Sequence, residues 1–147
     1  MYEKILVTTD GSTLSKKAVR SAVEFCVATS AELVVLHVVP RYPVSYFEGS
    51  ISMSPAELAR TEKAWADKGQ ELVDGVVRLA HTAGVAAKGV IVTSDLVAES
   101  IVSTAKKHKC DLVMMASHGR KGIKRLLLGS ETQHVLTHST VPVLVLR

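Results

Sequence analysis

The segment from Ala116 to Ser130, ASHGRKGIKRLLLGS, gathers residue types suited to binding a phosphate group. Its glycines at 119 and 122 let backbone N–H groups face a ligand with no Cβ in the way. The Gly129-Ser130 pair is typical of a helix start, where the N-terminal amides carry partial positive charge. The cations between residues 120 and 125 add charge nearby. An anion, most naturally phosphate, would fit here, although turn glycines, an N-cap serine and a solvated basic face would also account for the pattern.

The rest of the chain supplies elements that would position this segment. Short apolar runs predict strands over Lys4 to Thr9, Glu32 to Val39, Ala87 to Thr93, Asp111 to Ala116 and Pro142 to Leu146. Apolar residues at helical spacing predict helices over Ser12 to Ala28, Ser54 to about Gly84, Asp95 to His108 and Ser130 to about His138. In the second helix Leu58, Trp65, Leu72, Val76 and Leu79 form one apolar stripe.

Two helix starts carry capping signals. Ser54-Pro55-Ala56-Glu57 predicts a capping box with proline at the first helical position, and Ser130-x-x-Gln133 predicts a second one. Strands that alternate with helices indicate a doubly wound parallel α/β sheet, and 147 residues correspond to one domain over 1–147. Ligands of such sheets bind at the carboxyl ends of strands where the strand order reverses. The turn Asp10-Gly11-Ser12 and the segment from Ala116 to Ser130 are therefore the places to search.

Several classes of site and partner are disfavoured. GxxxxGK[ST] is absent, and the first strand is followed by DGSTLS rather than GxGxxG, which argues against a Walker NTPase and a Rossmann dehydrogenase. The two cysteines form no CxxC, so we expect no metal site built from side chains. His118 has no carboxylate near it in sequence and is read as a loop hydrogen bonder rather than a base.

The hydropathy and the charge of the chain predict its location and limit its partners. Its apolar runs fall far below the ~18 to 20 residues that cross a bilayer, and the opening MYEKILVTTD does not resemble a signal peptide. We therefore expect a cytoplasmic protein with no membrane partner. The formal charge of +4 comes from Lys and Arg that are spread over the helices, which argues against nucleic acid as a partner.

From KILVTTDGS to PVLVLR the chain resembles the universal stress proteins of the single-domain, UspA-like superfamily. The ATP-binding members carry G-x2-G-x9-G-[ST], which falls here on Ala116, Gly119, Gly129 and Ser130, so alanine replaces the first glycine. The resemblance implies a five-stranded parallel sheet in the order 3-2-1-4-5 with helices on both faces. It also implies ATP, with Mg²⁺, bound at the carboxyl ends of strands 1 and 4.

The same resemblance implies a set of binding residues and no catalytic one. Thr8, Asp10 and Val38 match positions that line the adenosine, with Asp10 suited to accept hydrogen bonds from the ribose hydroxyls. Gly119, Gly129 and Ser130 match the phosphate-contacting part, and its neighbours are Ser117, His118 and Arg120. Met115, Ala116 and Glu131 complete the set of cofactor-binding residues. Asp10 is equally suited to forming a turn or capping a helix, and a buried valine on a central strand needs no ligand.

Three functions remain open at this point. The first is a stress-response protein that binds ATP as a nucleotide-dependent sensor or regulator. The second is an ATPase, which would be slow because no water-activating residue is visible. The third is a nucleotide-free dimer that acts through protein partners at the loop from Pro40 to Met53 or at the dimer surface, and Ala116 favours it. The run PVLVL is apolar on both faces, so we expect a homodimer through Pro142 to Leu146, an arrangement that the family's dimers resemble.

Overall fold

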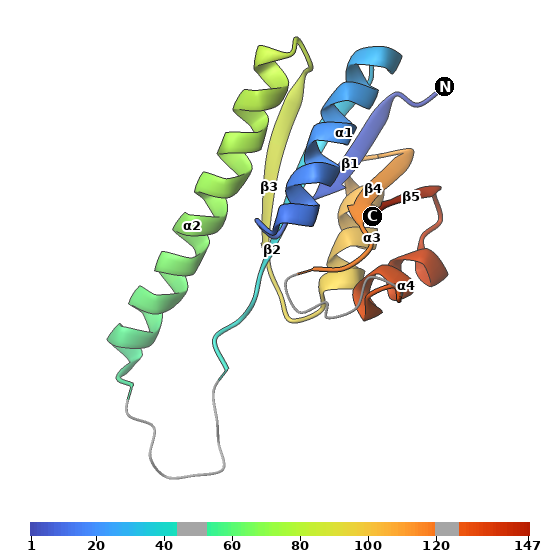
Figure 1. The fold of residues 1–147 in the computed structure, drawn as a ribbon. Helices are drawn as coiled ribbons and strands as arrows, with labels where there is room; N and C mark the ends of the chain where they lie inside the picture. The colour runs from blue at the N-terminus through green and yellow to red at the C-terminus, as the bar shows by residue number, and fades with distance from the viewer. Residues whose placement is uncertain (44–52, 120–126) are drawn as a thin grey trace.

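The computed structural model describes residues 1–43, 53–119 and 127–147 and confirms the predicted architecture (Figure 1). All strand pairs in the described chain are parallel, and the sheet order is β3-β2-β1-β4-β5. The strands are β1 (Lys4–Thr8), β2 (Glu32–Val39), β3 (Ala87–Thr93), β4 (Leu112–Ala116) and β5 (Val143–Leu146). The helices are α1 (Thr13–Thr29), α2 (Pro55–Thr82), α3 (Val97–Lys107) and α4 (Ser130–His138).

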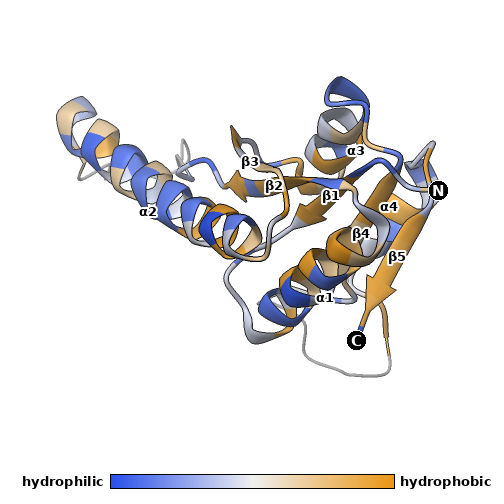
Figure 2. Cartoon of the chain, turned by 90° about the horizontal axis from the view of Figure 1, so that it is seen from above, coloured by the Kyte–Doolittle hydropathy of each residue, from blue (hydrophilic) through white to orange (hydrophobic). Residues whose placement is uncertain are grey.

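The helices cover both faces of the sheet (Figure 2). Ile5 and Val7 of β1 belong to a core cluster with α1 and α2, whereas Leu6, between them, belongs to the opposite cluster with α3 and α4. Side chains of a strand alternate between faces, so a central strand between two helical layers must be apolar at every position. This requirement explains the continuous apolar runs of β1, β2 and β4.

Most of the predicted helix ends are confirmed. The Ser54–Glu57 capping box is formed at the start of α2, and Gly84 follows the end of this helix at φ +79°. The predicted cap of α4 is wrong, because Gly129 is the N-cap and makes no side-chain hydrogen bond to the helix. Gln133, expected to complete a capping box, instead donates from Nε2 to the Leu128 carbonyl at 3.1 Å.

The buried face of α2 differs from the predicted stripe. Its buried residues are Gly69, Val73, Val76 and Ala80, while Leu79 is 44% exposed. The stripe was wrong at Leu79, because the buried face runs through the small residues Gly69 and Ala80, to which a hydropathy pattern gives little weight. Within the described part of the chain, no helix combines the length and the apolar character needed to cross a membrane.

Candidate functional site

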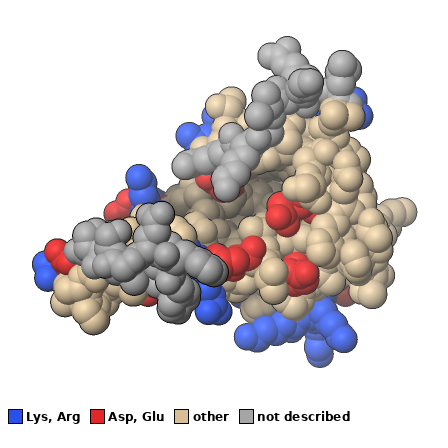
Figure 3. Space-filling model, turned by 90° about the horizontal axis from the view of Figure 1, so that it is seen from below, with Lys and Arg blue, Asp and Glu red and all other residues tan. Residues whose placement is uncertain are grey.

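The candidate site lies at the edge of the sheet where the parallel strands have their carboxyl ends. β1 and β4 are neighbours there, and the chain continues from them into α1 and toward α4. Figure 3 looks onto this edge and shows a surface hollowed near its centre, with acidic side chains around the hollow and Lys and Arg farther out. Strand order reverses at this point of the sheet, which is the usual ligand position in such folds.

The turn after β1 is held by its own side chains. Asp10 Oδ1 accepts a hydrogen bond of 2.9 Å from the Ser12 amide, and Gly11 between them adopts φ +78°. Ser12 in turn caps α1 by accepting from the Ser15 amide. The Thr9 hydroxyl accepts from the Gly11 amide at 3.3 Å. Asp10 therefore has the turn-forming role that its sequence context allowed, through one of its two carboxylate oxygens.

Gly119, three residues after the end of β4, comes directly against this turn. A Cβ built on Gly119 would lie 2.7 Å from Oδ2 of Asp10, a separation at which one of the two groups must shift. Gly119 is itself exposed, so the lack of a side chain leaves its backbone open beside the carboxylate. The structure thus brings together Asp10 and Gly119, which the sequence assigned to the same site from two distant segments.

Gly129 has a packing role that sequence reasoning did not anticipate. Its amide donates to the Ser117 carbonyl at 2.8 Å. A Cβ at Gly129 would lie 3.3 Å from both that carbonyl oxygen and the His118 Cα, which is closer than a side chain tolerates without movement. Glycine here lets the start of α4 approach the end of β4, and this approach places the first turn of the helix at the site.

Thr132 is a site-building residue that the sequence did not reveal. Its side chain is buried, and its hydroxyl lies 3.1 Å from the carbonyl oxygens of both Ala116 and Ser117. One threonine on α4 therefore anchors the carbonyl of the last residue of β4 and the carbonyl of the residue that follows it. No local pattern could have identified it, because the partners are distant in sequence and become neighbours only in the folded chain.

The polar neighbours of this anchor take separate roles. Ser117 is buried, and its hydroxyl is 3.2 Å from Nδ1 of the half-buried His118, in keeping with the predicted loop hydrogen bonder. Glu131 points toward α3, where its Oε2 accepts a hydrogen bond of 3.0 Å from the Ala98 amide. Leu96, the N-cap of α3, cannot provide such a bond, so Glu131 supplies the missing cap.

The other predicted binding residues lie on strand ends or at the start of α4. Thr8 is the last residue of β1, and Val38 and Met115 belong to the apolar layer under α3 and α4. Ser130 is the first residue of α4. Arg120 lies outside the described residues. Among the residues that are described, no group of three His, Cys, Asp or Glu side chains is arranged to hold a metal ion.

Comparison with known proteins agrees with this architecture. The family model described as the universal stress protein family matches residues 1–147. A universal stress protein of Methanocaldococcus jannaschii is 33% identical over 147 residues, which is 100% of this chain and 83% of that protein. The structure of the universal stress protein UspA from Lactobacillus plantarum superposes with a TM-score of 0.82 at 26% identity, covering 99% of this chain and 98% of that one.

A further solved structure carries a ligand. It is a universal stress protein in complex with cAMP, with a TM-score of 0.68 and 25% identity over 99% of this chain and 97% of that chain. The family model spans the whole chain, and the relative from Methanocaldococcus jannaschii is 33% identical over all of this chain. The chain therefore belongs to the universal stress protein family.

Proposed function

We propose that this protein binds an adenine nucleotide at the carboxyl edge of β1 and β4, as ATP with Mg²⁺, and acts in the cytoplasm as a nucleotide-dependent sensor or regulator of a stress response. The observation that carries the proposal is the meeting of Asp10 and Gly119 beside the N-terminus of α4. Support also comes from a universal stress protein of the same fold that is in complex with cAMP.

The chemistry of the edge divides a nucleotide between two subsites. The Asp10 carboxylate is an acceptor suited to ribose hydroxyls, and its negative charge disfavours phosphate at the same point. The first turn of α4 is the complementary place for phosphate, because its N-cap is a glycine without a side-chain hydrogen bond to the helix amides. The ribose then lies near Asp10 and the phosphates lie toward Gly129 and Ser130.

The same edge of the sheet also suits the apolar adenine base and the Mg²⁺ ion of the nucleotide. Val38 and Met115 supply an apolar layer next to the strand ends, as the flat face of a base requires. The described residues provide no ready-made three-ligand cage. Mg²⁺ is commonly held by one or two carboxylates, water and the phosphates of a substrate, so it would enter with ATP.

Calorimetric titration tests this proposal. The purified chain is titrated with ATP and Mg²⁺, and in parallel with AMP, cAMP, adenosine and GTP. We expect ATP to bind more tightly than AMP, because the α4 N-terminus recognises phosphates beyond the first. Equal affinity for ATP, AMP and adenosine would exclude recognition of the polyphosphate. Absence of binding by every adenine compound would refute the proposed function.

One observation favours a second function, a nucleotide-free dimer that acts through protein partners. β5 is an edge strand, Leu144 on it is 40% exposed, and Leu136 of the adjoining α4 is 42% exposed. Together with alanine at position 116, this apolar edge would account for a protein whose output depends on assembly. A dimer that binds no nucleotide in the titration above would establish this alternative.

A further inference from the structure

His37 lies on the part of β2 that extends beyond β1. The β1–β2 pairing ends at Thr8 and Leu36, whereas β2 continues alongside β3 through Val39. The His37 ring reaches back across this step, and its Nδ1 lies 2.7 Å from the Thr9 carbonyl oxygen. A carbonyl can only accept, so Nδ1 carries the proton and donates. The imidazole therefore makes the next link between the two strands after their backbone ladder has ended.

The hydrogen bond from His37 occupies the last free polar group of Thr9. The Thr9 amide donates to the Leu36 carbonyl at 3.0 Å, and its hydroxyl accepts from the Gly11 amide. With the carbonyl bound by His37, the amide, the hydroxyl and the carbonyl of this buried residue are all engaged. Asp10 follows directly. The orientation of the peptide that leads into Asp10 is thus set from β2.

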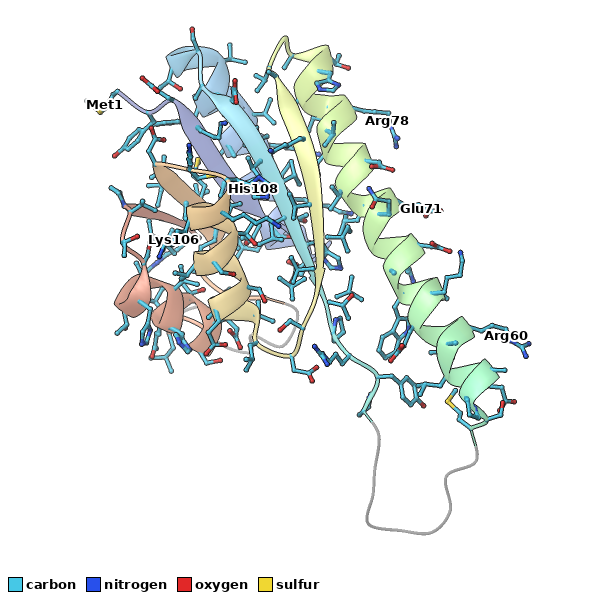
Figure 4. The ribbon with its side chains drawn as sticks, turned by 180° about the vertical axis from the view of Figure 1, so that it is seen from behind. Met1, Arg60, Glu71, Arg78, Lys106 and His108 are labelled. Atoms are coloured by element: carbon cyan, nitrogen blue, oxygen red, sulfur yellow. The ribbon has the colours of Figure 1, made fainter. Side chains whose placement is uncertain are left out.

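The other edge of the His37 ring contacts α2. A Cβ on Gly69 would lie 2.7 Å from Cδ2 and 3.3 Å from Nε2 of His37, and 3.1 Å from Cγ2 of Val39. The helix can sit this close only because residue 69 has no side chain. Figure 4 shows the opposite side of α2, where Arg60, Glu71 and Arg78 point away from the sheet. The inner face of α2 therefore rests on the same ring that holds the Thr9 carbonyl.

We propose that His37 is a positioning residue of the nucleotide site. It couples the packing of α2 on the sheet to the conformation of the Thr9–Gly11 turn. A movement of α2 at Gly69 displaces the ring, weakens its bond to the Thr9 carbonyl and shifts the Asp10 carboxylate. The nucleotide affinity of the site therefore changes when a partner binds to α2 or bends this helix. The effect on nucleotide affinity rests on the function proposed above, whereas the effect on the turn is measurable without nucleotide.

The first test replaces the ring. His37→Ala removes the donor, and we expect affinity for ATP with Mg²⁺ to fall about three- to tenfold, the effect of losing one hydrogen bond. His37→Asn places an amide N–H where Nδ1 lies, and we expect it to restore affinity to within about twofold of the wild type. Circular dichroism melting establishes that both variants are folded. Equal losses in the Ala and Asn variants, or no loss in either, would overturn the assignment.

The second test acts on α2 alone. Gly69→Ala brings a methyl group against the ring, whereas Gly75→Ala on the same helix meets only the Arg78 guanidinium at 3.8 Å. We expect Gly69→Ala to weaken ATP binding about three- to tenfold and Gly75→Ala to leave it unchanged. In a His37→Ala background the contact with the ring is gone and the contact with Cγ2 of Val39 remains, so Gly69→Ala should cause a much smaller further loss. Equal effects of the two glycine variants, or full additivity with His37→Ala, would contradict the coupling.

A ligand-free measurement separates this inference from the proposed function. The Gly11 amide resonance in ¹H–¹⁵N spectra reports the turn, and we expect it to shift in His37→Ala and Gly69→Ala but not in Gly75→Ala. A wild type that binds no adenine nucleotide, with these shifts present, would refute the function and leave the positioning role standing. An unmoved Gly11 resonance in both His37→Ala and Gly69→Ala would refute the positioning role, whatever the wild type binds. If Gly69→Ala does not fold, the comparison of His37→Ala with His37→Asn decides alone.

Discussion

Gly119 and Asp10 meet at the carboxyl edge of the sheet so closely that a Cβ on Gly119 would lie 2.7 Å from the Oδ2 atom of Asp10. The other oxygen, Oδ1, is already bound to the Ser12 amide, so the carboxylate cannot turn away without breaking that bond. A side chain at residue 119 would therefore push the Asp10 carboxylate out of its present position. A change at Gly119 thus acts on the turn after β1 through the Asp10 carboxylate.

Gly119→Ala should consequently weaken nucleotide binding while leaving the fold in place. The methyl group must displace the Asp10 carboxylate, which we assign to the ribose, and we expect a loss of at least about tenfold in affinity for ATP with Mg²⁺. Thermal stability should change little, because residue 119 is exposed. Calorimetry and melting curves check the two parts, with Gly75→Ala as the control glycine. Unchanged affinity would remove Asp10 from the ribose subsite.

Thr132→Val should destabilise the protein. The substitution keeps the shape of the side chain but removes a buried hydroxyl from the carbonyls of Ala116 and Ser117. We expect the free energy of unfolding to fall by ~1 to 3 kcal/mol, measured by urea denaturation. Thr137→Val on the same helix is the matched control, because its hydroxyl bond to the Gln133 carbonyl is exposed. Equal effects of the two changes would show that Thr132 is not an anchor of β4.

Much of the fold was predictable because it depends on local pattern. Residue type and period predict the strand ends at Thr8 and Ala116, the turn at Asp10 and the cap at Ser54. The structure places each of them within one residue of its predicted position. The joint location of Asp10 and Gly119 was also predictable, since parallel strands bring their carboxyl ends to one edge.

The remainder depended on contacts between distant segments. Ser130 resembled an N-cap, yet Gly129 took that role because its amide is held by the Ser117 carbonyl. The bond by which Glu131 caps α3 at the Ala98 amide also joins two segments that are distant in sequence. The close approach of Gly69 to the His37 ring likewise joins α2 to a strand that is distant in sequence. Hydropathy and spacing carry no information on such close approaches.

Ala116→Gly tests the departure from the family's glycine pattern. Ala116 is 8% exposed, pairs with Leu146 in β5 and has its carbonyl held by Thr132. Removing the methyl group gives a ligand more room, while the added backbone freedom costs up to ~1 kcal/mol. The two effects oppose each other, so we expect ATP affinity to change by less than about tenfold. A wild type without ATP binding and an Ala116→Gly variant with micromolar affinity would instead support the nucleotide-free function.

His108 should make the protein less stable in mild acid. Desolvation lowers the pKa of this side chain, and the charges of Lys88, Lys107 and Lys4 lower it further. Below its unfolded pKa, near ~6.5, the unfolded chain then binds a proton that the folded chain resists, so stability falls as the pH drops. Urea denaturation across pH 5 to 8 should show a weaker dependence in His108→Gln. An identical pH profile for the variant would show that His108 does not contribute.

The exposed edge of β5 leads to the last prediction, a homodimer that forms through this strand. Leu144 is 40% exposed on a strand that has β4 as its neighbour on one side and ends the described sheet on the other. Pairing with the same strand of a second copy would satisfy the edge and cover this side chain. Light scattering at micromolar concentration should therefore give the mass of a dimer.

Leu144→Lys supplies the decisive variant, because a charged side chain at a sheet edge opposes strand pairing and remains solvated in the monomer. We expect this variant to be monomeric with little loss of thermal stability. Leu79→Lys is the matched control, since Leu79 is similarly exposed at 44% but lies on α2 and should leave the dimer intact. A monomeric wild type would exclude the dimer. A dimeric Leu144→Lys variant would place the interface on another surface. Burying an unpaired lysine between two copies of β5 would cost more free energy than the pairing of so short a strand provides.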